Sequence, residues 1–93
     1  MVLRVAATSS PASVAGAVAH LIREQGSASV QTVGAAALNQ AVKAIAVARA
    51  FMLPEGHKLT FVPSFTEIEI GGARRTALRL EVSDSMPARP RAR

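Results

Sequence analysis

The 93-residue sequence contains no cysteine, no tyrosine and no tryptophan. The absence of cysteine excludes disulfides, thiolate metal sites and cysteine nucleophiles, and it fits a reducing compartment. We therefore expect a cytoplasmic protein. A chain of this length is expected to fold around one hydrophobic core, which argues against a multi-domain enzyme.

Aromatic side chains are scarce, since only Phe51, Phe61 and Phe65 are present. The chain is nevertheless 49% hydrophobic, so we expect a core of Ala, Val, Leu and Ile that also takes up the phenylalanines. Proteins that bind single strands stack bases on exposed rings. The composition disfavours such a platform and predicts that any contact with nucleic acid is led by the phosphate backbone.

Long apolar runs are also expected to be missing. Residues 1–7 carry Arg4 and are not expected to form a signal peptide. No later stretch is expected to approach the roughly 18 apolar residues that a membrane span needs. We therefore expect no membrane partner.

Positive charge is concentrated near the C-terminus. Residues 1–70 hold five basic and four acidic side chains, whereas residues 71–93 hold six arginines and two acids. A nearly neutral body with a basic end indicates a localised anionic partner. The alternative is that the arginines only keep a small, alanine-rich protein soluble.

The first part of the chain predicts a strand followed by a helix. Residues 2–7 are apolar apart from one arginine and are expected to form a buried strand. Ser10 and Pro11 suit the cap and the first position of a helix over residues 11–25. Gly26 suits the left-handed position that follows such a helix.

A second strand and a second helix are expected next. Residues 27–33 predict a short strand, and residues 35–53 predict a helix that Pro54 stops. One apolar stripe of this helix faces the core, and a second face consists of small side chains. We expect that second face to form a subunit interface, unless a loop or the other helix covers it. The stripe is Leu38, Val42, Ile45 and Met52, and the small face is Ala46, Val47 and Ala50.

The end of the chain predicts a β-hairpin. Residues 58–70 alternate, but the apolar positions change from odd to even numbers, which indicates a bulge near residues 63–66. Residues 76–82 predict the last strand. Setting Ile68 opposite Leu78 leaves residues 71–75 as a five-residue loop, with Arg74 and Arg75 at its tip.

The element order predicts an α+β two-layer sandwich, β-α-β-α-β-β, with two helices on one face of a four-stranded mixed sheet. Residues 1–84 are expected to form this single domain. Residues 85–93 combine proline and arginine with little apolar bulk and predict a disordered basic tail.

No residue pattern supports catalysis, a cofactor or a metal. His20 and His57 lie on different elements, and no ligand cluster or activated nucleophile is recognisable. Glu67 and Glu69 share one strand face and are expected to form a solvated charge set directed towards Arg79. We therefore expect neither an enzyme nor a small-molecule substrate.

The strongest candidate for phosphate contact is the glycine pair of residues 71–72 with Arg74 and Arg75, because two guanidinium groups on a protruding hairpin can each fork onto phosphate oxygens. The alternative is an ordinary solvated hairpin tip. The start of the second helix, residues 34–37, offers free N–H groups to an anion. Asn39 and Lys43 lie near that end and extend a polar surface or form its solvated side.

Three segments resemble the bacterial stage V sporulation protein S family: SSPASVAGA at 9–17, GAAALNQAVKAIAVARAF at 34–51 and FTEIEIGGARRTALRL at 65–80. The resemblance covers residues 2–83. That family is similar in turn to the Alba chromatin proteins of archaea, which implies the β-α-β-α-β-β fold, a homodimer and binding of DNA or RNA.

The match to the Alba pattern is incomplete. Ser9 and Ser10 stand where Alba proteins have a lysine pair, and residues 34–37 lack the arginine found there. The hairpin arginines are retained. We therefore expect weaker duplex binding with little sequence preference, since each lost phosphate contact flattens the salt dependence. The expected nucleic-acid-binding residues are Ser9, Ser10, Asn39, Lys43, Arg74, Arg75 and Arg79.

The resemblance implies a sporulation or developmental role, with a homodimer or higher homo-oligomer formed through the second helix and the sheet. The rival hypothesis is an oligomeric scaffold or protein-interaction module in sporulation that does not bind nucleic acid. The missing lysine pair and the small-residue helix face favour this rival.

Overall fold

The computed structural model describes residues 1–85. Four strands and two α-helices follow the predicted order, so the α+β architecture is confirmed. The elements are β1 (Val2–Val5), α1 (Pro11–Gln25), β2 (Ser27–Thr32), α2 (Ala35–Met52), a 3₁₀ turn η1 (Leu53–Glu55), β3 (Leu59–Ile70) and β4 (Ala73–Asp84).

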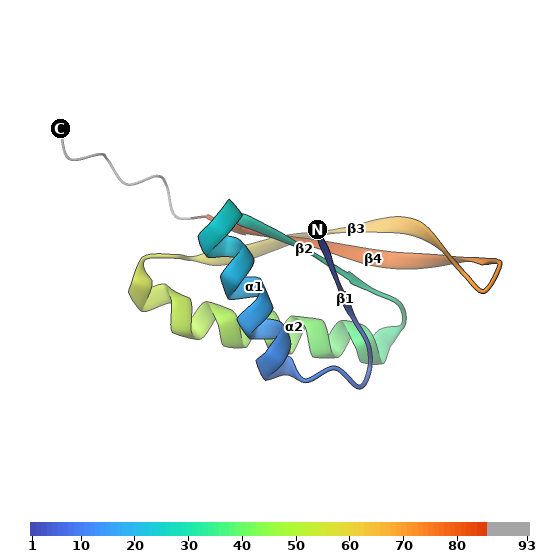
Figure 1. The fold of residues 1–93 in the computed structure, drawn as a ribbon, viewed down its shortest axis with the longest axis horizontal. Helices are drawn as coiled ribbons and strands as arrows, with labels where there is room; N and C mark the ends of the chain where they lie inside the picture. Colours follow the sequence, from blue (N-terminus) through green and yellow to red (C-terminus); the bar gives the residue numbers. More distant parts are fainter. Residues whose placement is uncertain (86–93) are drawn as a thin grey trace.

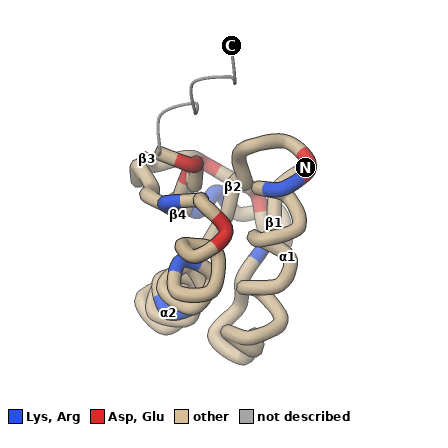
Figure 2. The backbone as a smooth tube through the Cα atoms, turned by 90° about the vertical axis from the view of Figure 1, so that its left-hand side faces the viewer, with Lys and Arg blue, Asp and Glu red and all other residues tan. Residues whose placement is uncertain are grey.

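The sheet has the order β1-β2-β4-β3. β1 runs parallel to β2, whereas β4 is antiparallel to both of its neighbours, so the sheet is mixed as predicted. Figures 1 and 2 show both helices on the same side of the sheet. The other side carries no helix within the described residues.

Local sequence signals account for both ends of α1. The Ser10 hydroxyl accepts a hydrogen bond from the Ser13 N–H at 3.3 Å, and Pro11 occupies the first helical position. At the other end Gly26 adopts φ 83°, and its N–H donates to the Ile22 carbonyl at 2.8 Å. The predicted helix over residues 11–25 is confirmed to the residue.

Alanines bring the two helices close together. Ala15 on α1 and Ala41, Ala44 and Ala48 on α2 are completely buried. Small side chains let helix backbones approach closely, so these alanines take the inner face. Val42, predicted in the core stripe, is instead 39% exposed. The predicted small-residue face is exposed, namely Ala46, Val47 and Ala50.

β1 differs from the buried strand predicted over residues 2–7. It ends at Val5 and pairs only with β2, so it is an edge strand. Val2 is exposed, and only Val5 is fully buried. The apolar run was a poor guide because an edge strand of four residues can bury one side chain and leave its neighbours in solvent.

The hairpin contains no bulge, and the predicted register is wrong. β3 and β4 pair without interruption from Leu59 opposite Asp84 to Ile70 opposite Ala73. The bulge was required only to bury every apolar side chain of β3 on one face. Ile68 and Ile70 in fact lie on the opposite face from Phe61 and Phe65, and Ile70 is 49% exposed, so the strand keeps its regular alternation.

The turn of the hairpin consists of two residues rather than five. Gly71 and Gly72 have φ values of 57° and 80°. A two-residue turn with positive φ at both positions matches the twist of the flanking strands and favours glycine. Arg74 and Arg75 therefore belong to β4 and not to a loop.

We predict that Gly71→Val destabilises the hairpin by about 1–2 kcal/mol, because an L side chain is strained in the left-handed region. A Cβ at this position would meet no atom within 4 Å, so the effect is conformational rather than steric. Gly71→Asn is the matched control, since asparagine tolerates this conformation. Urea unfolding and amide exchange measure both, and equal losses would contradict the turn assignment.

α2 corrects the expectation about apolar runs. Residues Ala35–Glu55 have a mean hydropathy of 1.2 and are long and apolar enough to cross a membrane by length and composition. That expectation was wrong because the many alanines raise the mean without forming a visible run. The inner face of α2 is packed against α1 and the sheet, and core helices meet the same criterion.

Candidate functional site

The outer part of the β3–β4 hairpin forms an arm, which we define as residues 66–77. β2 pairs with β4 only between Leu78 and Ser83, so the arm is two-stranded. It extends past the helices and contributes to a molecule 54 Å long but only 22 Å and 17 Å across (Figure 1). Both strands of the arm are therefore accessible.

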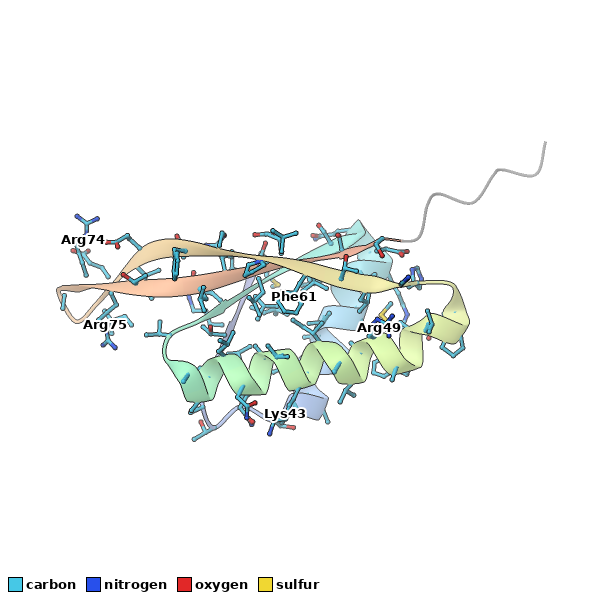
Figure 3. All side chains as sticks on the ribbon, turned by 180° about the vertical axis from the view of Figure 1, so that it is seen from behind. Lys43, Arg49, Phe61, Arg74 and Arg75 are labelled. Atoms are coloured by element: carbon cyan, nitrogen blue, oxygen red, sulfur yellow. The ribbon has the colours of Figure 1, made fainter. Side chains whose placement is uncertain are left out.

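The two arginines of the arm have different surroundings. Arg74 forms an ion pair with Glu67 at 3.0 Å, and both side chains are largely exposed. Such a surface pair contributes little and can be displaced. Arg75 forms no ion pair within residues 1–85. Figure 3 shows the two side chains on opposite sides of the arm.

The arm is not the basic projection that the sequence predicted. Glu67 and Glu69 lie on it together with Arg74 and Arg75, so its charges balance. The prediction counted the glutamates with the body because it placed the arginines in a loop. The arm alone therefore offers an anion no excess of positive charge.

The two glutamates do not point to Arg79 as predicted. Glu67 instead contacts Arg74 and accepts a hydrogen bond from the Thr76 hydroxyl at 3.3 Å. Arg79 lies on the other side of the sheet, where its NH2 group donates to the Gln31 side-chain oxygen at 3.2 Å. Its NH1 group lies 3.8 Å from Glu81.

Strand alternation places two arginines, Arg4 and Arg79, on the side of the sheet that faces away from the helices, which we call the open face. Arg4 on β1, Gln31 on β2 and Arg79 on β4 form one cross-strand row. Arg75 has the same strand phase as Arg79, but the arm twists, and Figure 3 shows the Arg75 side chain on the side of the arm that the helices occupy. Outside the arm, Glu81 is the one acidic side chain that the described strands place on this face, so this part of the face is net positive.

A cavity of about 510 Å³ adjoins this row of side chains. It lies between the end of β1 and the arm, and Arg4 and Gln31 line it together with Ile68. Ile68 is the cross-strand partner of Arg75. The twist of the arm thus brings the open face of the hairpin towards the ends of β1 and β2.

Sequence reasoning missed Arg4 and Gln31 as candidate site residues. Arg4 stands between Leu3 and Val5, and alternation alone directs it away from the core. This alternation could have identified Arg4 as a surface residue from the sequence alone. The position of Gln31 beside Arg79 depends on the β2–β4 register, which no local pattern specifies.

The predicted serines are engaged in local structure. The Ser9 hydroxyl accepts from the Ala6 N–H at 2.8 Å, and the Ser9 carbonyl accepts from the Gln40 side chain at 2.8 Å. Ser10 caps α1. These bonds fix the β1–α1 loop against α2, and each hydroxyl proton remains free to donate.

Asn39 and Lys43 are exposed on α2. Lys43 points away from the sheet, whereas Arg74 and Arg75 lie on the arm (Figure 3). One chain therefore does not bring the helix residues and the arm arginines into a single site. The structure instead groups Arg79 with Arg4 on the open face, and Arg75 lies opposite Ile68 on the arm.

Ionic contacts elsewhere have a structural role. Arg23 donates two hydrogen bonds to Glu55, at 2.8 Å and 3.1 Å, and so links α1 to η1. This hydrogen bonding lowers the pKa of Glu55 and raises the pKa of Arg23. His57 Nδ1 lies 2.8 Å from Asp84 and joins the start of β3 to the end of β4. Within residues 1–85 no three His, Asp or Glu side chains form a metal-ligand group.

The fold and this surface define a class of small α+β domain in which a long two-stranded arm stands beside an arginine-bearing sheet face. Residues 1–85 match the family described as stage V sporulation protein S. The chain belongs to this family, as the resemblance predicted, and has a sporulation-related role. This family is not a known enzyme family.

Proposed function

We propose that the protein binds nucleic acid during sporulation through the open face of its sheet. The observation that carries the proposal is that Arg4 and Arg79 share the open face, next to a cavity that Arg4 lines, while Arg75 lies opposite Ile68 of the same cavity on the arm. Arg4 and Arg75 form no ion pair with any residue that the structure describes. Unpaired guanidinium groups on a net positive surface are suited to phosphate oxygens.

Arg79 would act differently from the two unpaired arginines. Its hydrogen bond to Gln31 holds the guanidinium in place, and its side chain is only 29% exposed. Less conformational freedom is then lost when it contacts a phosphate. Arg4 and Arg75 would supply mobile contacts on either side of it. Contacts of this kind favour backbone recognition with little sequence preference.

A homodimer formed through α2 is part of this proposal. The outer face of α2 exposes Val47 and Phe51, and the following turn η1 exposes Leu53, each more than 40% accessible. Together with Ala46 and Ala50 they make an apolar helix surface that a second copy can cover. Two arms in one dimer would raise the affinity for a single duplex. The cysteine-free composition supports a cytoplasmic location.

The test is a fluorescence anisotropy titration with labelled duplex DNA, single-stranded DNA and RNA at two ionic strengths. We expect binding to at least one polymer that weakens as salt rises, because counterions are released on association. Absence of binding to all three at the lower ionic strength would refute the proposal.

One observation favours the alternative of a scaffold or protein-interaction module. Phe65 is 80% exposed on β3, and Leu38 of α2 lines the same shallow pocket. An exposed aromatic side chain at the free edge of a sheet is suited to a protein partner. Salt-insensitive association that Phe65→Ser abolishes, without nucleic-acid binding, would support this alternative.

A further inference from the structure

The cavity beside Arg4 contains an unused hydrogen-bond donor. Gln31 is only 7% exposed, and its side-chain oxygen is occupied by Arg79. This contact fixes the orientation of the amide, so the NH₂ group is left without an acceptor among the described residues. This NH₂ group lies on a residue that lines the cavity, so it can donate to an acceptor that enters there.

Other residues around the cavity restrict what this acceptor can be. Arg4 adds a second, charged donor, and Glu69 adds an acceptor that forms no ion pair within residues 1–85. The remaining walls are apolar, with Val5, Val33, Ala37, Ile68 and Ile70 among them. The volume of about 510 Å³ lies in the range of small-ligand sites. A flat group with apolar faces and polar edges matches this lining.

We propose that this cavity binds one unpaired guanine base of a single-stranded or looped nucleic acid. Guanine presents O6 and N7 as acceptors on one edge, which suits Arg4 and the Gln31 amide. Its N1–H and N2–H donors on another edge suit a carboxylate such as Glu69. No other base combines two adjacent acceptors with two adjacent donors in this way.

The location of the cavity fits a strand that passes between the arm and the β1–α1 loop. Ala6 and Ala7 of that loop line the cavity on one side, and Ile68 to Ile70 of the arm line it on the other. Bases in single strands can be splayed out into such pockets, whereas bases in an intact duplex cannot. The inference rests on the proposed function and adds a base preference to it.

The experiment compares equal-length oligouridylates with and without one central guanosine, using anisotropy at a fixed ionic strength. We expect the guanosine oligomer to bind about tenfold more tightly. Replacing guanine by 7-deazaguanine, which lacks the N7 acceptor, should remove most of this preference. A central adenosine or cytidine that binds as well as guanosine would overturn the assignment.

Variants separate a base contact from a phosphate contact. Arg4→Ala is expected to lower the guanosine preference, whereas Arg49→Ala, an equal charge loss on α2, leaves it unchanged. Ala6→Leu narrows the cavity without a charge change and is also expected to remove the preference. If Arg4→Ala and Ala6→Leu keep the preference intact, the cavity is not the guanine site.

Failure of this inference differs from failure of the proposed function. Equal, salt-sensitive binding of the two oligomers would overturn the guanine site and leave the nucleic-acid function standing. No binding of either oligomer, of duplex DNA or of longer RNA would overturn both.

Discussion

Replacing Arg4 and Arg75 together by alanine is expected to weaken binding of the preferred nucleic acid by about tenfold or more near physiological salt. Arg4 lies on the open face and lines the cavity, Arg75 lies opposite Ile68 of the same cavity, and neither forms an ion pair within the described residues. If each contacts a phosphate, the slope of log K against log salt should fall by about two units for a duplex. The measurement is a salt series of anisotropy titrations.

The matched control is the double variant Arg49→Ala with Arg74→Ala, which removes the same charge. Arg49 lies on α2, and Arg74 is paired with Glu67 on the opposite side of the arm. We expect this control to change the affinity less than threefold, as a loss of long-range attraction alone would. An equal loss in both double variants would indicate that net charge, rather than the open face, determines binding.

Leu80→Ala is expected to destabilise the fold by about 2–5 kcal/mol, which is a large part of the stability of a small domain. Leu80 is 1% exposed and lies between Val30 of β2 and Pro63 of β3. Its removal leaves a cavity that the regular strands on both sides cannot close. At about 4–8 °C for each kcal/mol, the melting temperature should fall by at least about 8 °C.

Leu53→Ala provides the control for this prediction because the same atoms are removed from a partly solvated position. Leu53 is 42% exposed in η1. We expect a loss below about 1 kcal/mol in the monomer, since less apolar surface returns to water. Thermal unfolding followed by circular dichroism measures both variants, and similar losses would show that the assigned core is wrong.

Leu53→Ala also bears on the dimer. If α2 and the adjoining turn form the subunit interface, the loss of stability caused by Leu53→Ala should grow with protein concentration, because association stabilises the folded state by mass action. Melting temperatures at two protein concentrations separate the loss of monomer stability from the loss of dimer contacts.

The open-face site could be predicted only in part from the sequence. Arg75 and Arg79 were recognised as binding candidates, but Arg75 was placed with Arg74 at a loop tip. The structure separates these neighbours, because consecutive residues of a strand point to opposite sides. Gly71 and Gly72 carried enough information for the correct turn. The wrong turn was predicted because every apolar residue of β3 was assumed to be buried on one face, which required a bulge and a longer loop.

The sequence by itself determined the order of the elements, the ends of α1 and the family. Those features depend on neighbouring residues, such as the Ser10 cap, Pro11 and Gly26, or on a long stretch of similar sequence. Only the tertiary structure decided which side chains share the open face and its cavity. The row of Arg4, Gln31 and Arg79 joins three strands, and its register is fixed by hydrogen bonds and core packing between segments far apart in the chain.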